Sequence, residues 1–120
     1  MNPTIKKIIY WGLTAMVAFV FAGSAYGKLS GSMAPGFGID AETFKLLGCI
    51  ELASLVLFII PRTGLLGSLL LVAYMGGAIA THVEHAQPIG APIMITAFVW
   101  VVALFRFPEL SNRILGKSND

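Results

Sequence analysis

Long apolar runs recur four times along the chain, separated by shorter polar segments. The expected helices cover residues 8–28, 41–60, 64–82 and 89–107. A helix needs about 20 mostly apolar residues to span the hydrocarbon core of a bilayer, and each run is close to that length. The connections leave no room for a further soluble domain. The pattern therefore predicts an all-α integral membrane protein, folded as an antiparallel four-helix bundle in a single domain, residues 1–120.

Local signals fix several of the helix ends. Asp40 can cap the second helix, with Glu42 in its first turn facing the positive end of the helix dipole. The segment 61–64 (PRTG) predicts a tight turn, because Pro61 cannot continue a helix and glycine tolerates unusual backbone angles. The second and third helices are therefore expected to be antiparallel neighbours. Pro108 ends the fourth helix, and the polar tail after it is expected to fray.

Composition supports a membrane location. Of the 120 residues, 57% are hydrophobic and only 12% are charged, whereas soluble domains average roughly a quarter charged residues. The single cysteine, Cys49, cannot form a disulfide within one chain, which argues against a thiol-disulfide oxidoreductase. The net charge of +2 comes from basic residues at helix ends. Membrane topology explains this charge better than nucleic-acid binding does.

The basic residues are unequally divided between the two expected sides of the membrane. The richer side carries Lys6, Lys7, Arg62, Arg106, Arg113 and Lys117, and the other carries Lys28 and Lys45. Cytoplasmic loops are enriched in Lys and Arg, so both termini are expected in the cytoplasm of a multi-pass cell (inner) membrane protein. Tyr10 and Trp11 fit the inner interface. A cleaved signal peptide ending near residues 22–24 is the alternative, and would leave an odd number of spans.

Glu51 is the most informative residue of the chain. It lies about ten residues, or about 15 Å, into the second helix. A charged group at that depth costs at least a few kcal/mol unless it is paired, protonated or hydrated. We therefore expect its side chain to point into the bundle.

The candidate partners of Glu51 come from the same end of other helices. Lys28 closes the first helix, with Ser24 one turn earlier; His82 closes the third, with Tyr74 two turns earlier on the same stripe. Measured from that end of the helices, the depths of Ser24 and Tyr74 in the membrane bracket the depth of Glu51. The five side chains are therefore expected to line one outward-facing polar pocket. They are candidates for ligand binding or proton handling, and no catalytic residue can be assigned.

The candidate pocket residues also have simpler, structural explanations. The Glu51–Lys28 pair can serve only to hold helices together, and Lys28 can instead extend to the headgroups. His82 and His85 are three residues apart, but two imidazoles are a weak metal signal, and no metal site is predicted. Glycine pairs in the first and third expected helices are typical of close helix packing or dimerisation.

Four segments carry a resemblance to a known family. They are residues 21–29 (FAGSAYGKL), 46–52 (LLGCIEL), 61–67 (PRTGLLG) and 74–82 (YMGGAIATH). In this order they resemble the DoxX-like family of small four-helix membrane proteins. The resemblance implies a four-helix bundle with Lys28, Glu51 and His82 as its polar positions. Some relatives are named as subunits of quinone-linked sulfur oxidation, others belong to redox-stress complexes, and distant eukaryotic relatives are assembly chaperones.

Two functions are therefore weighed. In the first, the chain is an accessory subunit of a quinone-linked redox system, with a bound quinone in its pocket and electrons supplied by a partner redox subunit. In the second, it binds a lipid or small molecule without catalysis and acts in membrane-protein assembly. Both involve membrane lipids and allow a homo-oligomer, neither involves nucleic acid, and no intrinsic cofactor is expected.

Overall fold

Every regular element in the part of the chain that the structure describes, residues 2–117 of this computed structural model, is an α-helix. The helices are α1 (Pro3–Ser30), α2 (Ala41–Ile59), α3 (Gly64–Glu84), α4 (Gly90–Arg106) and the short α5 (Pro108–Ile114). The all-α prediction is confirmed over these residues.

Helix α1 is longer at both ends than the apolar run 8–28 predicts. It begins at Pro3, where the Asn2 side chain accepts a hydrogen bond from the Thr4 amide (2.7 Å). It ends at Gly31, whose φ of 79° lies in the left-handed region that glycine adopts without strain. Hydropathy does not detect the first and last turns of α1, because these turns contain polar residues. They are helical because caps at Asn2 and Gly31 stabilise them.

Helix α2 begins where its cap predicts. The Asp40 carboxylate accepts a hydrogen bond from the Thr43 amide at 2.7 Å. This backbone hydrogen bond, together with one from the Thr43 hydroxyl, holds the pKa of Asp40 below its usual value. The charged form of Asp40 therefore caps the first turn of α2 at neutral pH.

The segment after α4 corrects the expectation of a frayed tail over residues 108–114; residues 118–120 of that tail lie outside the described chain. Helix α4 ends at Arg106 with Phe107 as its cap, and residues from Pro108 form α5, which is bent by 110° relative to α4. The ring of a proline fixes φ near its helical value and lacks an N–H, so proline is well suited to the first position of a helix. Pro108 therefore ends one helix and begins the next.

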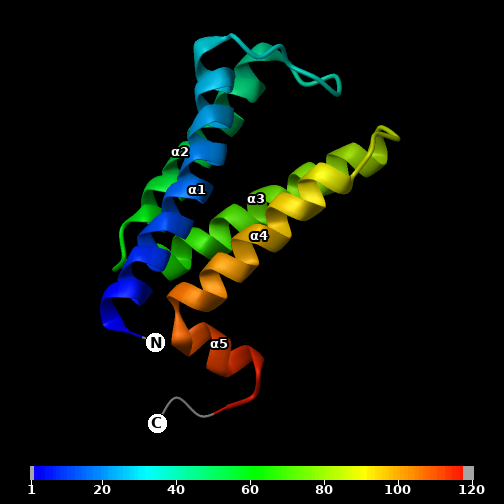
Figure 1. The fold of residues 1–120 in the computed structure, drawn as a ribbon. Helices are drawn as coiled ribbons and strands as arrows, with labels where there is room; N and C mark the ends of the chain where they lie inside the picture. Colours follow the sequence, from blue (N-terminus) through cyan, green and yellow to red (C-terminus); the bar gives the residue numbers. More distant parts are fainter. Residues whose placement is uncertain (1, 118–120) are drawn as a thin grey trace.

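The four long helices lie in two pairs (Figure 1). Helix α1 lies beside α2 and α3 beside α4; the pairs meet near the N-terminus and α5 and diverge toward the α1–α2 and α3–α4 loops. One buried apolar core is shared by all four, with members Val17, Phe21, Leu55, Phe58, Leu71, Met75, Val99 and Val102. Because the pairs separate at one end, the antiparallel four-helix bundle stays a prediction.

Two glycines of α3 bring helices into close contact. A Cβ atom at Gly67 would overlap the backbone of Phe58 in α2, and one at Gly64 would lie 2.6 Å from the Phe107 ring. Gly64 has no positive φ, so its function is close packing rather than the unusual backbone angle suggested by the sequence. Gly76 and Gly23 have no atom within 4 Å of an added Cβ, so they do not mediate packing inside this chain.

The outer surface of the helices is apolar. Helices α1 and α3 are long and apolar enough to cross a membrane, and α4 with α5 would be a third span if the bent pair were continuous. Large side chains such as Phe19 (83% exposed) and Met94 (73%) face outward. Exposing such large apolar side chains to water is unfavourable, whereas contact with lipid tails carries no such cost. The chain is therefore a membrane protein.

Candidate functional site

A buried ion pair joins α1 to α2. The Lys28 ammonium lies 3.1 Å from the Glu51 carboxylate, with side-chain exposures of 10% and 2%. Gly48, one turn before Glu51, allows this approach, since a Cβ there would lie 2.9 Å from the Lys28 Cβ. Glu51 thus points into the protein and is paired, as its cost in lipid predicts.

Three donors converge on one oxygen of Glu51. Its Oε1 accepts hydrogen bonds from the Ser24 hydroxyl (3.1 Å), from Lys28 Nζ (3.1 Å) and, more weakly, from the Tyr74 hydroxyl (3.4 Å). Lys28 also donates to Ser24 Oγ at 2.6 Å. The network connects three helices, because Tyr74 belongs to α3. A buried charge held this way satisfies much of its hydrogen-bonding capacity without water.

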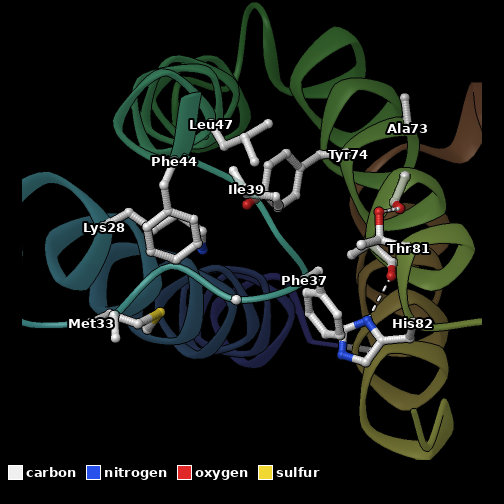
Figure 2. Close-up of a pocket in the computed structure, with 14 residues that line it drawn as sticks. Lys28, Met33, Phe37, Ile39, Phe44, Leu47, Ala73, Tyr74, Thr81 and His82 are labelled. Atoms are coloured by element: carbon white, nitrogen blue, oxygen red, sulfur yellow. Dashed lines mark hydrogen bonds between the residues drawn. The ribbon is translucent and has the colours of Figure 1, made fainter. Parts of the chain in front are cut away.

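A cavity of about 510 Å³ lies beside this network. We call it the loop-end cavity, because its lining comes from the α1–α2 loop and the adjoining parts of α1, α2 and α3 (Figure 2). It is lined by Lys28, Met33, Ala34, Gly36, Phe37, Ile39, Phe44, Leu47, Ala73, Tyr74, Gly77, Ala78, Thr81 and His82. Most of these side chains are apolar, so a few polar groups face a largely apolar space, as in many small-molecule sites.

The α1–α2 loop covers one side of the loop-end cavity. Figure 2 shows the loop crossing toward α3, with the Phe37 ring beside His82. The Phe37 ring centre lies 4.8 Å from that of His82 and 5.1 Å from that of His85. Phe37 has a φ of 59°, which is unfavourable for a bulky residue. These aromatic contacts hold the loop against α3 despite that cost.

One ring nitrogen of His82 bonds to its own helix, and the other has no hydrogen bond within residues 2–117. Its Nδ1 lies 2.6 Å from the Ala78 carbonyl oxygen. A carbonyl can only accept, so Nδ1 carries the proton, and in the neutral ring Nε2 is left as an acceptor. The cavity wall therefore combines a donor, Lys28, with an acceptor, His82.

The five candidate residues separate into two groups. Ser24, Lys28, Glu51 and Tyr74 form one hydrogen-bonded network. His82 lines the same cavity as Lys28 and Tyr74 but is bonded to its own helix, whereas Glu51 and Ser24 lie behind the lining. Their role in ligand binding stays a prediction.

Sequence reasoning missed other lining residues. Phe37 and Ile39 come from a loop without periodicity, so the sequence gives no signal for them. Phe44 was detectable, since it lies seven residues, or two turns, before Glu51 and so shares its helix face. Its ring lies 5.5 Å from Lys28 Nζ, where an aromatic face favours a cation.

Metal ligands do not gather in the described part of the chain. Residues 2–117 contain no group of three or more His, Cys, Asp or Glu side chains placed to hold an ion. His82 and His85 each contact Phe37, and each binds the carbonyl four residues earlier through Nδ1. Their spacing on the helix is explained by these contacts.

Fold and site together define a small helical membrane protein with a buried ion pair next to an apolar cavity. The sequence profile of the DoxX-like family matches residues 12–105, from early in α1 to the end of α4. The chain belongs to the DoxX-like family, which confirms the resemblance seen in the sequence. No curated protein and no solved structure matches the chain.

Proposed function

We propose that the chain binds a lipid-soluble quinone in the loop-end cavity, as an accessory subunit of a membrane redox system. The observation that supports this most is the position of Lys28. It lies between a buried anion and an apolar cavity large enough for a small aromatic head group. The family match gives no ligand for the chain, and the proposal adds the class of ligand.

The proposal places four helices across the cell (inner) membrane as an antiparallel bundle. Two features support this arrangement. All four helices contribute to one core, and Lys and Arg are more numerous on the side that carries both termini, as expected for a cytoplasmic side. Both termini then lie in the cytoplasm, and the loop-end cavity opens toward the outer leaflet, where a lipid-soluble ligand can enter between the diverging pairs.

Lys28 has the hydrogen-bonding capacity for a carbonyl ligand. An ammonium has three N–H donors, and Ser24 and Glu51 use two of them. The third can go to a quinone carbonyl oxygen. His82 Nε2 can accept from the hydroxyl of the reduced form. Phe44, Leu47 and Ile39 offer an apolar wall for the ring.

Electrons would come from a partner redox subunit, because the chain has a single cysteine and no dithiol pair. The residues of this chain would then bind and orient the ligand, exclude water and hold protons at His82 and Lys28. A homo-oligomer is compatible with the exposed Gly76 of α3, where an added Cβ would have no neighbour within 4 Å in this chain.

Non-catalytic lipid binding, with a role in membrane-protein assembly, is the second function. The apolar lining of the loop-end cavity favours it, because an acyl chain needs no hydrogen-bond partner. The two differ in the need for Lys28: a quinone head uses its third N–H, whereas an acyl chain does not.

Titration with a short-chain ubiquinone analogue tests the proposal. The protein is held in nanodiscs of phosphatidylcholine, and binding is followed by isothermal calorimetry. The variant Lys28→Met/Glu51→Gln removes the donor without leaving a buried charge, and we expect affinity to fall about tenfold, the lower end for a charge-assisted hydrogen bond. The control Lys45→Met removes an exposed lysine that does not line the loop-end cavity and should bind as wild type.

Two results would contradict the quinone proposal. One is saturable binding that is equal in all three proteins; the other is no saturable binding at all. Retention of a phospholipid that the analogue cannot displace, seen by native mass spectrometry, would favour the lipid-binding function instead.

A further inference from the structure

A second cavity, of about 470 Å³, lies at the opposite end of the molecule. Its lining comes from the start of α1, the α2–α3 turn and the α4–α5 junction: Pro3, Lys6, Lys7, Tyr10, Trp11, Pro61, Phe105, Arg106 and Pro108. We call it the basic-end cavity, because three of these residues are basic and none is acidic. It shares no lining residue with the loop-end cavity.

Arg106 is the unusual member of this lining. It is only 5% exposed, although a charged residue at a helix end could reach water. Its position follows the buried stripe of α4 through Val99 and Val102. One nitrogen, Nη2, donates to the Tyr10 hydroxyl at 3.2 Å. Within residues 2–117, Nε and Nη1 have no hydrogen-bond partner.

Aromatic rings surround the Arg106 guanidinium. Its Cζ lies 4.7 Å from the centre of the Tyr10 ring, 4.4 Å from that of Phe58 and 5.0 Å from that of Phe107. Such rings favour a cation through their faces, but they supply no lone pair to an N–H. They hold the guanidinium in place, and within residues 2–117 they leave Nε and Nη1 unpaired.

Among residues 2–117, no carboxylate forms an ion pair with this cluster. The described residues contain one ion pair, Lys28–Glu51, at the other end of the molecule. Glu109 follows in the first turn of α5, but it forms no ion pair with Arg106, Lys6 or Lys7 in the described chain. An anion that enters the basic-end cavity would meet three positive charges, one of which is the buried guanidinium of Arg106.

We propose that the basic-end cavity binds a phosphate group, supplied by an anionic membrane lipid or by free phosphate. A phosphate offers several acceptor oxygens, which suit the planar fork of arginine better than a single-atom anion does. Lys6 and Lys7 are exposed and can close over the same group. Trp11 and Tyr10 belong to the residue types that sit at headgroup level.

Lipid binding to the full chain, purified in a neutral maltoside detergent, tests this proposal. Native mass spectrometry compares phosphatidylglycerol with phosphatidylcholine of the same chain length, and equilibrium dialysis measures labelled inorganic phosphate. We expect phosphatidylglycerol to bind at least about 25-fold more tightly than phosphatidylcholine, since Lys6 and Lys7 should each add about fivefold.

Variants locate the site. Lys6→Gln/Lys7→Gln changes exposed residues, so it should fold, and we expect a loss of roughly 25-fold in phosphatidylglycerol affinity. The matched control Arg113→Gln/Lys117→Gln removes the same charge from exposed residues outside the cavity, and should change affinity less than about twofold. Arg106→Lys keeps the charge but loses the fork, and should weaken binding while the protein stays folded.

Each possible outcome of these experiments either supports the phosphate site or contradicts it. Tight phosphatidylglycerol binding that depends on Lys6 and Lys7 supports a lipid headgroup site. Inorganic phosphate binding with the same dependence supports the phosphate site with free phosphate as its ligand. Equal affinity for both lipids with no phosphate bound, or equal losses in the variant and its control, would overturn the proposal.

Discussion

Replacing Lys28 by methionine should destabilise the protein far more than replacing an exposed lysine. At the 3.1 Å separation of Lys28 from Glu51, the Coulomb attraction is about 5 kcal/mol at an effective dielectric constant of 20. Burial of two charges offsets much of that attraction, so the intact pair adds little net stability. Removing one partner is different, because the Glu51 carboxylate stays buried. We expect Lys28→Met to lower the free energy of unfolding by about 3–5 kcal/mol.

A double-mutant cycle isolates this coupling. Glu51→Gln should cost less than Lys28→Met, because Lys28, at 10% exposure near a helix end, can turn toward the headgroups. The double variant Lys28→Met/Glu51→Gln leaves no buried charge and should recover stability to within about 1.5 kcal/mol of wild type. The free energies come from unfolding in mixed detergent–SDS micelles, followed by circular dichroism.

Lys45→Met is the control for the loss of a lysine. Lys45 is exposed and in no ion pair of the described chain, so its loss should change stability by less than about 0.5 kcal/mol. The reasoning fails if Lys28→Met costs no more than this control. It also fails if the two single changes add up to the double change, because the pair would then have no coupling energy.

Three further predictions test other parts of the structure. Gly67→Ala should cost about 1–3 kcal/mol in the same unfolding assay through overlap with the α2 backbone, whereas Gly76→Ala, in open space, should gain up to about 1 kcal/mol; equal effects would contradict the close packing. Phe37→Ala should speed ligand release from the loop-end cavity in stopped-flow measurements, since the ring holds the loop against His82; unchanged rates would show that the loop does not limit exit. Because hydrogen bonds lower the pKa of Asp40 in the folded state, its stabilising effect is present above about pH 4 and is lost as the pH falls further; Asp40→Asn should remove this part of the acid dependence, and a variant with the wild-type acid profile would refute it.

Much of the fold could be predicted because its signals are local. Apolar runs, the Asp40 cap and the turn at Pro61 placed the four long helices within a few residues of their observed ends. The cost of a charge in lipid placed Glu51 inside and pointed to Lys28 as its partner. The helix ends depend on residues that are close together along the chain, and the placement of Glu51 depends on the cost of its own charge, so the sequence alone carries both signals.

The features that the sequence did not predict depend on how the helices approach one another. The divergence of the two pairs and the loop covering the cavity are set by long-range packing, so Phe37 could not be placed beside His82 in advance. Arg106 was counted as a marker of topology. Its seven-residue spacing from Val99 on a buried stripe was the available signal. That its Nε and Nη1 have no partner within residues 2–117 appears only in three dimensions.

Photo-crosslinking with an azido-quinone tests the central claim most directly, namely that the loop-end cavity is a ligand site. The protein in nanodiscs is irradiated with the analogue at low occupancy, and the labelled residues are mapped by peptide mass spectrometry. We predict labelling of cavity residues such as Phe44 and Tyr74, which excess unlabelled quinone suppresses. Labelling confined to outward-facing residues such as Phe19 and Met94, and insensitive to competition, would contradict the account.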